Sequence, residues 1–176
     1  QETDKTKVDI QSGYLERKPE LPDAFIYTQD TEGQVYIVHE GIKMWCNQAY
    51  VYLKDNFVKA YGEVKIKQGD TISMNSNYAE YNGNTQFAFA SGDVIFKEPQ
   101  TTLKTDTLYF DRVKQEAYYR SGGTVIDTAS TLTSRIGTYY AEQKNYQFTS
   151  DVKNVNPKYT INSQQLNFYS QTGASY

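Results

Sequence analysis

The chain has 176 residues, enough for one domain or one elongated array that buries about two-thirds of the surface its unfolded form exposes. Its mean hydropathy is −0.72, yet 15% of its residues are aromatic, with 17 Tyr and 8 Phe, a bias typical of half-buried β surfaces rather than of helices. A net charge of −3 without a Lys/Arg cluster excludes a typical nucleic-acid or polybasic membrane-surface protein, and no apolar run approaches the roughly 18 residues of a spanning helix.

The N-terminal region predicts a weak first copy of a repeated unit. The chain opens at Gln1 without a methionine, so we expect a mature or trimmed protein whose signal peptide has been removed. Ser12 and the stretch "GQVYI" at 33–37 resemble two motifs that recur more clearly downstream. An insertion containing Pro19 and Pro22 separates these two elements.

A small residue recurs at a nearly constant interval through the rest of the chain. It stands in "WCNQAYVY" at 45–52 and in four later stretches, with successive spacings of 30, 29, 29 and 29 residues. Each copy has a small or apolar residue three places on and an apolar or aromatic residue five places on. The recurring positions are Cys46, Ser76, Thr105, Ser134 and Ser163. Such self-similarity indicates a repeat architecture.

A second motif follows the first four of these small residues by 18 to 20 positions. A valine recurs there, and in the first three copies a glycine precedes it by two places, as in "AYGEVKIKQGD" at 60–70 and "ASGDVIFKEPQ" at 90–100. We expect the glycine to mark a kink or bulge in a strand. The valines are Val64, Val94, Val125 and Val152, and the glycines are Gly62, Gly92 and Gly123.

Within each unit, apolar and polar residues alternate with period two, as in "VKIK" and "FAFAS", and turn residues such as "QGD" and "NGN" separate the runs. The sequence therefore predicts an all-β array of about 29-residue, two-strand repeats with roughly a dozen strands. Parallel solenoid rungs and two facing antiparallel sheets both satisfy this pattern, and the short turns favour the antiparallel arrangement. We expect residues 1–176 to form a single repeat domain that continues beyond the C-terminal end.

Counting along the alternation predicts a long apolar interior. Such side chains can simply pack on one another, or the two sheets can splay and leave room for acyl chains. The candidate ligand-binding residues on this inner face are Val64, Ile66, Met74, Tyr81, Phe87, Phe89, Val94, Phe96, Leu108, Phe110, Phe148 and Phe168.

Catalytic and metal-binding patterns are sparse, and we expect neither catalysis nor a metal or cofactor. The single His39 has no nucleophile partner in a recognisable motif, and Cys46 reads as a small buried apolar residue. The aspartates mostly occupy turns or flank kinks. A polysaccharide lyase on a parallel solenoid is an alternative, and Asp106 and Arg135, which share one column of the repeat, are its only support.

The ends of a repeat array raise a separate question, because unpaired edge strands either accept another copy or need a cover. No capping helix is evident at either end. Head-to-tail self-association by strand addition is therefore one prediction, and covering by further segments of the chain is the alternative.

The order of the motifs resembles the OstA-like, or LptA-like, family of periplasmic lipopolysaccharide-transport proteins, and particularly its longer members from Bacteroidetes-type bacteria. The G-x-V strands, the "QGD" turn and the strand of small residue, two variable residues, apolar residue and aromatic residue support this from about residue 8 onward. The high tyrosine content and the early insertion depart from the pattern.

The resemblance implies a V-shaped, twisted antiparallel β-jelly roll whose interior binds the acyl chains of lipid A. It implies a non-enzymatic periplasmic module that carries lipopolysaccharide toward the outer membrane, with other lipopolysaccharide-transport components at the two membranes as partners. The alternatives are a periplasmic domain of an outer-membrane assembly protein of the same fold and a structural β-array that mediates end-to-end association.

Overall fold

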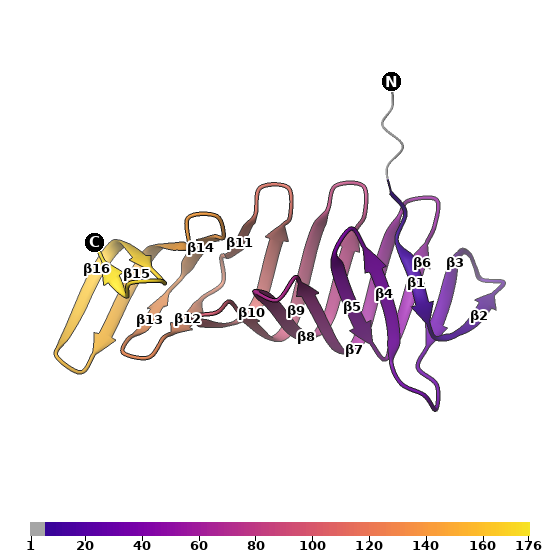
Figure 1. Cartoon of the computed structure of the whole chain (residues 1–176), viewed down its shortest axis with the longest axis horizontal. Coiled ribbons are helices and arrows are strands. Elements are labelled where there is room, and N and C mark those ends of the chain that lie inside the picture. The colour runs from indigo at the N-terminus through magenta and orange to yellow at the C-terminus, as the bar shows by residue number, and fades with distance from the viewer. Residues whose placement is uncertain (1–5) are drawn as a thin grey trace, which may run out of the picture.

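The computed structural model describes residues 6–176 and contains seventeen β-strands and no helix in that range. Figure 1 shows the strands stacked along the long axis, with β1 to β3 at one end and β15 to β17 at the other. The strands are β1 (Asp9–Ser12), β2 (Tyr14–Lys18), β3 (Leu21–Thr28), β4 (Val35–His39), β5 (Ile42–Cys46), β6 (Gln48–Tyr52), β7 (Phe57–Gln68), β8 (Ile72–Asn82), β9 (Phe87–Lys97), β10 (Thr102–Asp111), β11 (Glu116–Tyr119), β12 (Gly123–Ile126), β13 (Thr131–Ser134), β14 (Ile136–Tyr140), β15 (Asn145–Asn156), β16 (Tyr159–Tyr169) and β17 (Ala174–Ser175).

The hydrogen-bonded pairings divide the sheet into two long leaves that share their longest strands. Leaf one contains β2, β3, β6, β11, β14 and β17, and leaf two contains β1, β4, β5, β12 and β13. Strands β7, β8, β9, β10, β15 and β16 contribute one half to each leaf, with a register shift where they cross. All pairings are antiparallel, which confirms the predicted all-β jelly roll and excludes the parallel solenoid.

The glycine-valine motif forms the crossing point between the leaves, which we call the hinge. Gly62 and Glu63 have φ angles of 77° and 44°, and the pairing of β7 with β8 shifts between Tyr61 and Val64. Gly92 and Asp93 repeat this conformation in β9, with φ of 79° and 48°. Two successive left-handed residues make a bulge that turns the strand from one leaf into the other. This explains why the motif recurs once in each unit.

The small residue of the first motif lies on the same hinge. Ser76 donates to the carbonyl oxygen of Tyr78 at 2.9 Å, and Ser134 donates to that of Ile136 at 2.8 Å. Thr105 donates to the carbonyl oxygen of Gly122 at 2.7 Å. A hydroxyl at this place therefore satisfies carbonyl groups that the interrupted ladder leaves unpaired.

The structure has more strands than the predicted dozen because several hinges split one long strand into two. Strands β11 and β12, and β13 and β14, are separate elements where β9 and β15 are continuous. The proline-containing insertion forms the β2–β3 hairpin at the N-terminal end of leaf one. Among residues 6–176 no helix is long and apolar enough to cross a membrane.

Candidate binding interior

The two leaves enclose one continuous apolar interior that runs along the array. Strand residues from β3 to β15 alternate between buried and less buried positions, as in β4 and β8, so these strands present one face to this interior. Ten of the twelve candidate residues lie there and are at most 3% exposed. These ten are Val64, Ile66, Met74, Tyr81, Val94, Phe96, Leu108, Phe110, Phe148 and Phe168.

The other two candidates, Phe87 and Phe89, were placed on the wrong face. Both are only half-buried and lie on the outer face of leaf one, while Ala88 and Ala90 between and beside them are fully buried. At the hinge of β9, Gly92 and Asp93 lie opposite the single residue 106 of β10, and the buried Ala90 and Val94 on either side are four positions apart, so parity along β9 is preserved. Counting back from Val94 in steps of two therefore reaches the two alanines. In "FAFAS" the prediction placed the larger side chains inside. The alternation counted from the valine would have placed the alanines there instead.

The interior is filled with side chains in this structure, in contrast to the open slot between splayed sheets that the acyl-chain hypothesis anticipates. Phe96 of leaf two lies with its ring centroid 6.2 Å from that of Phe110 and 5.8 Å from that of Tyr139, both in leaf one. Contacts of this kind close the space between the leaves. A hydrocarbon chain could enter only if such side chains moved apart.

Buried groups along the hinge remain in their neutral forms. Desolvation raises the pKa of the Cys46 thiol to about 12, so the side chain acts as a small apolar residue, as predicted. Burial likewise raises the pKa of Tyr119 to about 12, and its hydroxyl lies 2.6 Å from that of Ser134. The ring of Tyr119 fills a slot between Gly123 and Gly137, where an added Cβ would approach it to 2.6 and 2.5 Å.

Opposite the hinge lies the mouth, where the turns of leaf one face those of leaf two. At its N-terminal end, the Asn56 side chain accepts from the Val8 amide at 2.8 Å and donates to the Thr6 carbonyl at 3.0 Å. His39 contacts the Thr6 carbonyl at 2.8 Å and the Tyr81 hydroxyl at 2.7 Å. His39 is therefore a satisfied, 3% exposed structural residue, and the segment at 6–8 covers this part of the mouth.

Farther along, Arg112 bridges the mouth from the turn after β10. Its guanidinium donates to the Glu40 carbonyl at 2.7 Å, to Gln68 Oε1 at 3.0 Å and to the Tyr81 hydroxyl at 3.0 Å. Gln115 reinforces this contact, because it donates to the Arg112 carbonyl and accepts from Gln68 at 2.8 Å. Sequence reasoning missed this group, since Arg112 and Glu40 lie 72 residues apart and no local pattern joins them.

A second polar bridge closes the mouth beyond Arg112. Thr101 of leaf two donates to Glu98 Oε1 at 2.6 Å and lies 3.0 Å from the hydroxyl of Tyr146 in leaf one. Tyr139 donates to the other oxygen of Glu98 at 3.4 Å. Burial raises the pKa of Tyr146 well above its ordinary value, so its hydroxyl remains protonated as a hydrogen-bonding group.

Between the two bridges the mouth has a small opening of about 160 Å³. Ile72 and Tyr139 belong to its wall and also to the buried interior, so the opening leads toward the apolar lining. Glu98, Glu142 and Lys144 supply charged groups at the same place. At Arg112 and at Thr101, the two leaves are thus joined across the mouth by side-chain hydrogen bonds rather than by strand pairing.

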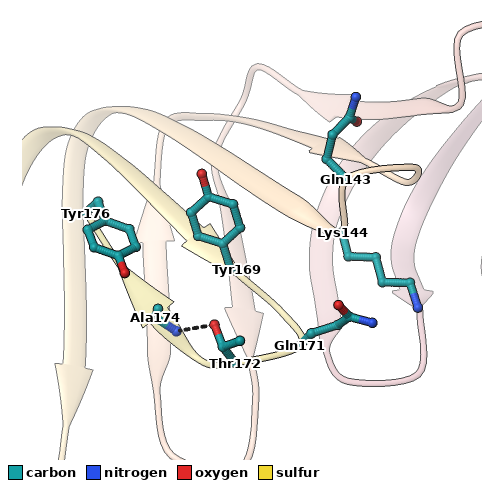
Figure 2. Close-up of a pocket in the computed structure, with 7 residues that line it drawn as sticks. All are labelled: Gln143, Lys144, Tyr169, Gln171, Thr172, Ala174 and Tyr176. Carbon is teal, nitrogen blue, oxygen red and sulfur yellow. Dashed lines mark hydrogen bonds between the residues drawn. The ribbon is translucent and has the colours of Figure 1, made fainter.

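The C-terminal end of leaf one has a larger depression of about 270 Å³, which Figure 2 shows. Tyr176 packs edge-on against Tyr169 there, with ring centroids 5.9 Å apart. The short strand β17 pairs only with Phe168 and Tyr169 of β16. The other half of β16, residues 159–163, pairs with β15 on one side and has no second partner strand within residues 6–176.

The described part of the chain does not bring together the residues that the sequence offers for metal binding or for a lyase site. No group of three or more His, Cys, Asp or Glu residues could hold a metal ion within residues 6–176. Asp106 and Arg135, the only support for a lyase, make no hydrogen bond or ion pair with each other. Asp106 instead accepts from the neighbouring Thr107 hydroxyl at 3.1 Å. The interior is therefore the candidate functional site.

Comparisons with known proteins give the same fold. The model of the family described as "OstA-like protein" matches residues 6–164. Among solved structures, a similar chain is LptH from Pseudomonas aeruginosa, described as the LptA homologous periplasmic component of the conserved lipopolysaccharide transport device. It shares 14% identity with a TM-score of 0.55, over 60% of this chain and 80% of that one. A search of the curated proteins gave no match.

Proposed function

Because the chain belongs to the OstA-like protein family, we propose that it is a non-enzymatic periplasmic transport module that carries lipopolysaccharide toward the outer membrane. The acyl chains of lipid A would occupy the interior between the two leaves, and the sugars and phosphates would stay in water. The fold shared with a periplasmic component of a lipopolysaccharide transport device supports this choice.

One observation carries the proposal: the apolar lining is continuous along both leaves, and beyond the part that residues 6–8 cover, side chains close it at the mouth. The leaves share a backbone at the hinge, whereas Arg112 and the Glu98–Thr101 group join them on the opposite side. Opening the mouth would break hydrogen bonds between side chains and carbonyls without breaking a strand ladder. Each acyl methylene that then replaced water contact would stabilise the complex by about 0.8 kcal/mol.

Photocrosslinking tests this proposal directly. A photoreactive phenylalanine analogue placed at Phe110 or Phe148 is expected to crosslink to lipopolysaccharide, because both side chains lie inside. The matched control is the same analogue at Lys65, on the exposed outer face of leaf two, which is expected to give no lipid adduct. A folded protein without adducts at either interior position would contradict the proposal.

A second candidate is a structural array that associates end to end, and one observation favours it. Residues 159–163 of β16 form an exposed edge with free pairing groups on one side, and Ile161 there is 38% exposed. Light scattering over a range of protein concentrations tests it, since edge pairing predicts a mass that rises with concentration. If the interior positions crosslink to lipid and the protein keeps its monomer mass at every concentration, the results favour transport without end-to-end association.

A further inference from the structure

The outer face of leaf one carries a continuous row of aromatic rings, which we call the outer aromatic ladder. It crosses six strands, and consecutive ring centroids lie 5.4, 5.0, 6.3, 5.4 and 5.1 Å apart. None of the six side chains is fully buried. The ladder consists of Tyr50 of β6, Tyr61 of β7, Tyr78 of β8, Phe89 of β9, Tyr109 of β10 and Tyr118 of β11.

Strand pairing alone does not require this ladder. In the register of leaf one, Tyr118 is followed by Thr138, Gln147 and Asn167 on the next three strands. Those strands pair as regularly as the preceding ones, although their outer residues in this row are polar. The same row is polar on β8 and β7, where Glu80 and Lys59 follow Phe89, so the rings of Tyr78 and Tyr61 continue the ladder diagonally rather than in register. Aromatic neighbours can strengthen a sheet, but an unbroken run of rings over six successive strands, which ends at Tyr118, indicates a surface with a further role.

A depression of about 450 Å³ lies on the ladder over β7 to β10. Phe57, Phe87, Phe89 and Tyr109 give it an aromatic wall. Polar side chains lie among these rings: Glu80, Asn82 and Thr85.

These polar groups retain capacity for hydrogen bonding. One Glu80 oxygen accepts from the Tyr78 hydroxyl at 2.5 Å, and its other oxygen has no partner within residues 6–176. Asn82 uses its side-chain oxygen for the amides of Asn84 and Thr85, and its amide nitrogen donates to no described residue. The depression thus combines half-buried rings with a carboxylate acceptor and an amide donor.

Few ligand classes match both features. A pyranose presents C–H bonds on its faces, which pack on aromatic rings, and hydroxyls on its edge, which bond to carboxylates and amides. An acyl chain would leave Glu80 and Asn82 without partners. A nucleic acid would meet Glu80, Asp111 and Glu116 on the same outer rows, in a chain of net charge −3.

We propose that the outer aromatic ladder binds an extended saccharide chain, with pyranose rings packed on Phe89 and Tyr109 and hydroxyls bonded to Glu80 and Asn82. The ring spacing of 5.0 to 6.3 Å is close to the length of one sugar unit, and the planes in these pairs are tilted by 52° and 69°, so successive units would meet ring edges as well as ring faces. The ladder lies on the opposite side of leaf one from the interior. It is therefore suited to a free linear glycan rather than to the sugars of a lipid held between the leaves, and it does not rest on the proposed transport function.

Saturation-transfer NMR on the intact chain tests the proposal with three probes: chitohexaose, maltohexaose and a lipid-free core oligosaccharide from lipopolysaccharide. Irradiation of aromatic protons is expected to saturate the C–H protons of at least one of the two linear probes, with binding that saturates on titration. Failure of both linear probes, or binding of the core oligosaccharide alone, would overturn the assignment to a free linear glycan. Neither result would bear on lipid crosslinking from the interior.

Two substitutions locate the site, and a third is the matched control. Tyr109→Ala is expected to weaken binding about tenfold or more, and Glu80→Gln to weaken it while leaving the packing of the sheet unchanged. Tyr140→Ala removes a half-buried ring from the outer face of β14, beyond the ladder, and is expected to leave binding unchanged. Equal loss in the control, or full binding by the folded Glu80→Gln and Tyr109→Ala proteins, would overturn the assignment.

Discussion

The first and second halves of the interior reach the same burial with opposite distributions of side-chain size. From β5 to β9, leaf one contributes mostly alanine and valine, and leaf two contributes larger side chains such as Met44, Ile66 and Met74. From β11 to β16 the sizes are reversed. There leaf one contributes Tyr119, Tyr139, Tyr146, Phe148 and Phe168, and leaf two contributes Val125, Leu132 and Val152.

This exchange shows how a repeat array can fill its interior along its length without repeating its core residues. In each half, large side chains on one leaf are combined with smaller ones on the other, so the interior is filled while the sequence varies. Phe96 lies near the exchange point and contacts Tyr139 across the interior. The two halves also differ in adaptability, because methionine re-packs more easily than the stacked rings of Tyr146 and Phe148, whose planes differ by 8°.

Truncation in both halves gives the largest expected effect and tests the exchange. Phe148→Ala in leaf one should lower the free energy of unfolding by about 3–5 kcal/mol, and Val58→Ala in the same leaf by only about 1.5 kcal/mol. Leaf two should show the reverse order along the chain, with Met74→Ala costing about 2–5 kcal/mol and Val152→Ala about 1.5 kcal/mol. Urea unfolding measures all four. Similar losses for the two residues of each leaf would contradict the exchange.

The two halves also differ in the residue that takes the left-handed conformation at the hinge. Exchanging the two residue types tests what this difference costs. Gly92 has φ of 79° in the first half, whereas Ser150 occupies the equivalent place in the second with φ of 66°. Gly92→Ser should cost about 1–3 kcal/mol, because a side chain is strained there and its Cβ would lie 2.9 Å from that of Asn77.

The reverse substitution, Ser150→Gly, should have the opposite sign. It relieves the left-handed strain, and the greater entropy of the unfolded glycine chain offsets part of the gain, so we expect stabilisation of up to about 1 kcal/mol. The midpoints of urea unfolding report both changes. Two shifts of the same sign would show that the hinges are not equivalent.

The smallest expected change in stability at neutral pH comes from the titration of Cys46 and Tyr119, one buried hinge group from each half. The pKa of each in the folded protein is about 12, above the ordinary values of 9.0 for Cys and 10.0 for Tyr. Folding therefore favours the protonated form. This stabilisation is complete below about pH 9 and is lost as the pH rises toward 12.

Urea unfolding at a series of alkaline pH values measures that loss. The Cys46→Ala protein should lose stability less steeply just above pH 9, and Tyr119→Phe should flatten the curve only from about pH 10, where an unfolded tyrosine titrates. Identical slopes in the parent chain and in both variants would assign the alkaline loss to other groups.

The sequence was sufficient for the architecture because the hinge is a local device. Glycines at positive φ and hydroxyls that bond two residues on leave a signature every 29 residues, and alternation gave the correct face for ten of the twelve candidates. The prediction was wrong for Phe87 and Phe89 because it favoured the larger side chains over the alternation counted from Val94. The hydrogen bonds that close the mouth could not be predicted, because Arg112 donates to carbonyl groups 72 and 73 residues away. Every residue has a backbone carbonyl, so the sequence does not mark which one accepts.

The repeated hinge also fixes a length scale. Each unit of about 29 residues adds two strands to each leaf, and neighbouring strands lie about 4.8 Å apart, so one unit extends the array by about 9.5 Å. Every rung touches only its neighbours, so gain or loss of a whole unit would change the span in fixed steps and leave the cross-section intact. Duplication or deletion of whole units would thus set the length of such a protein.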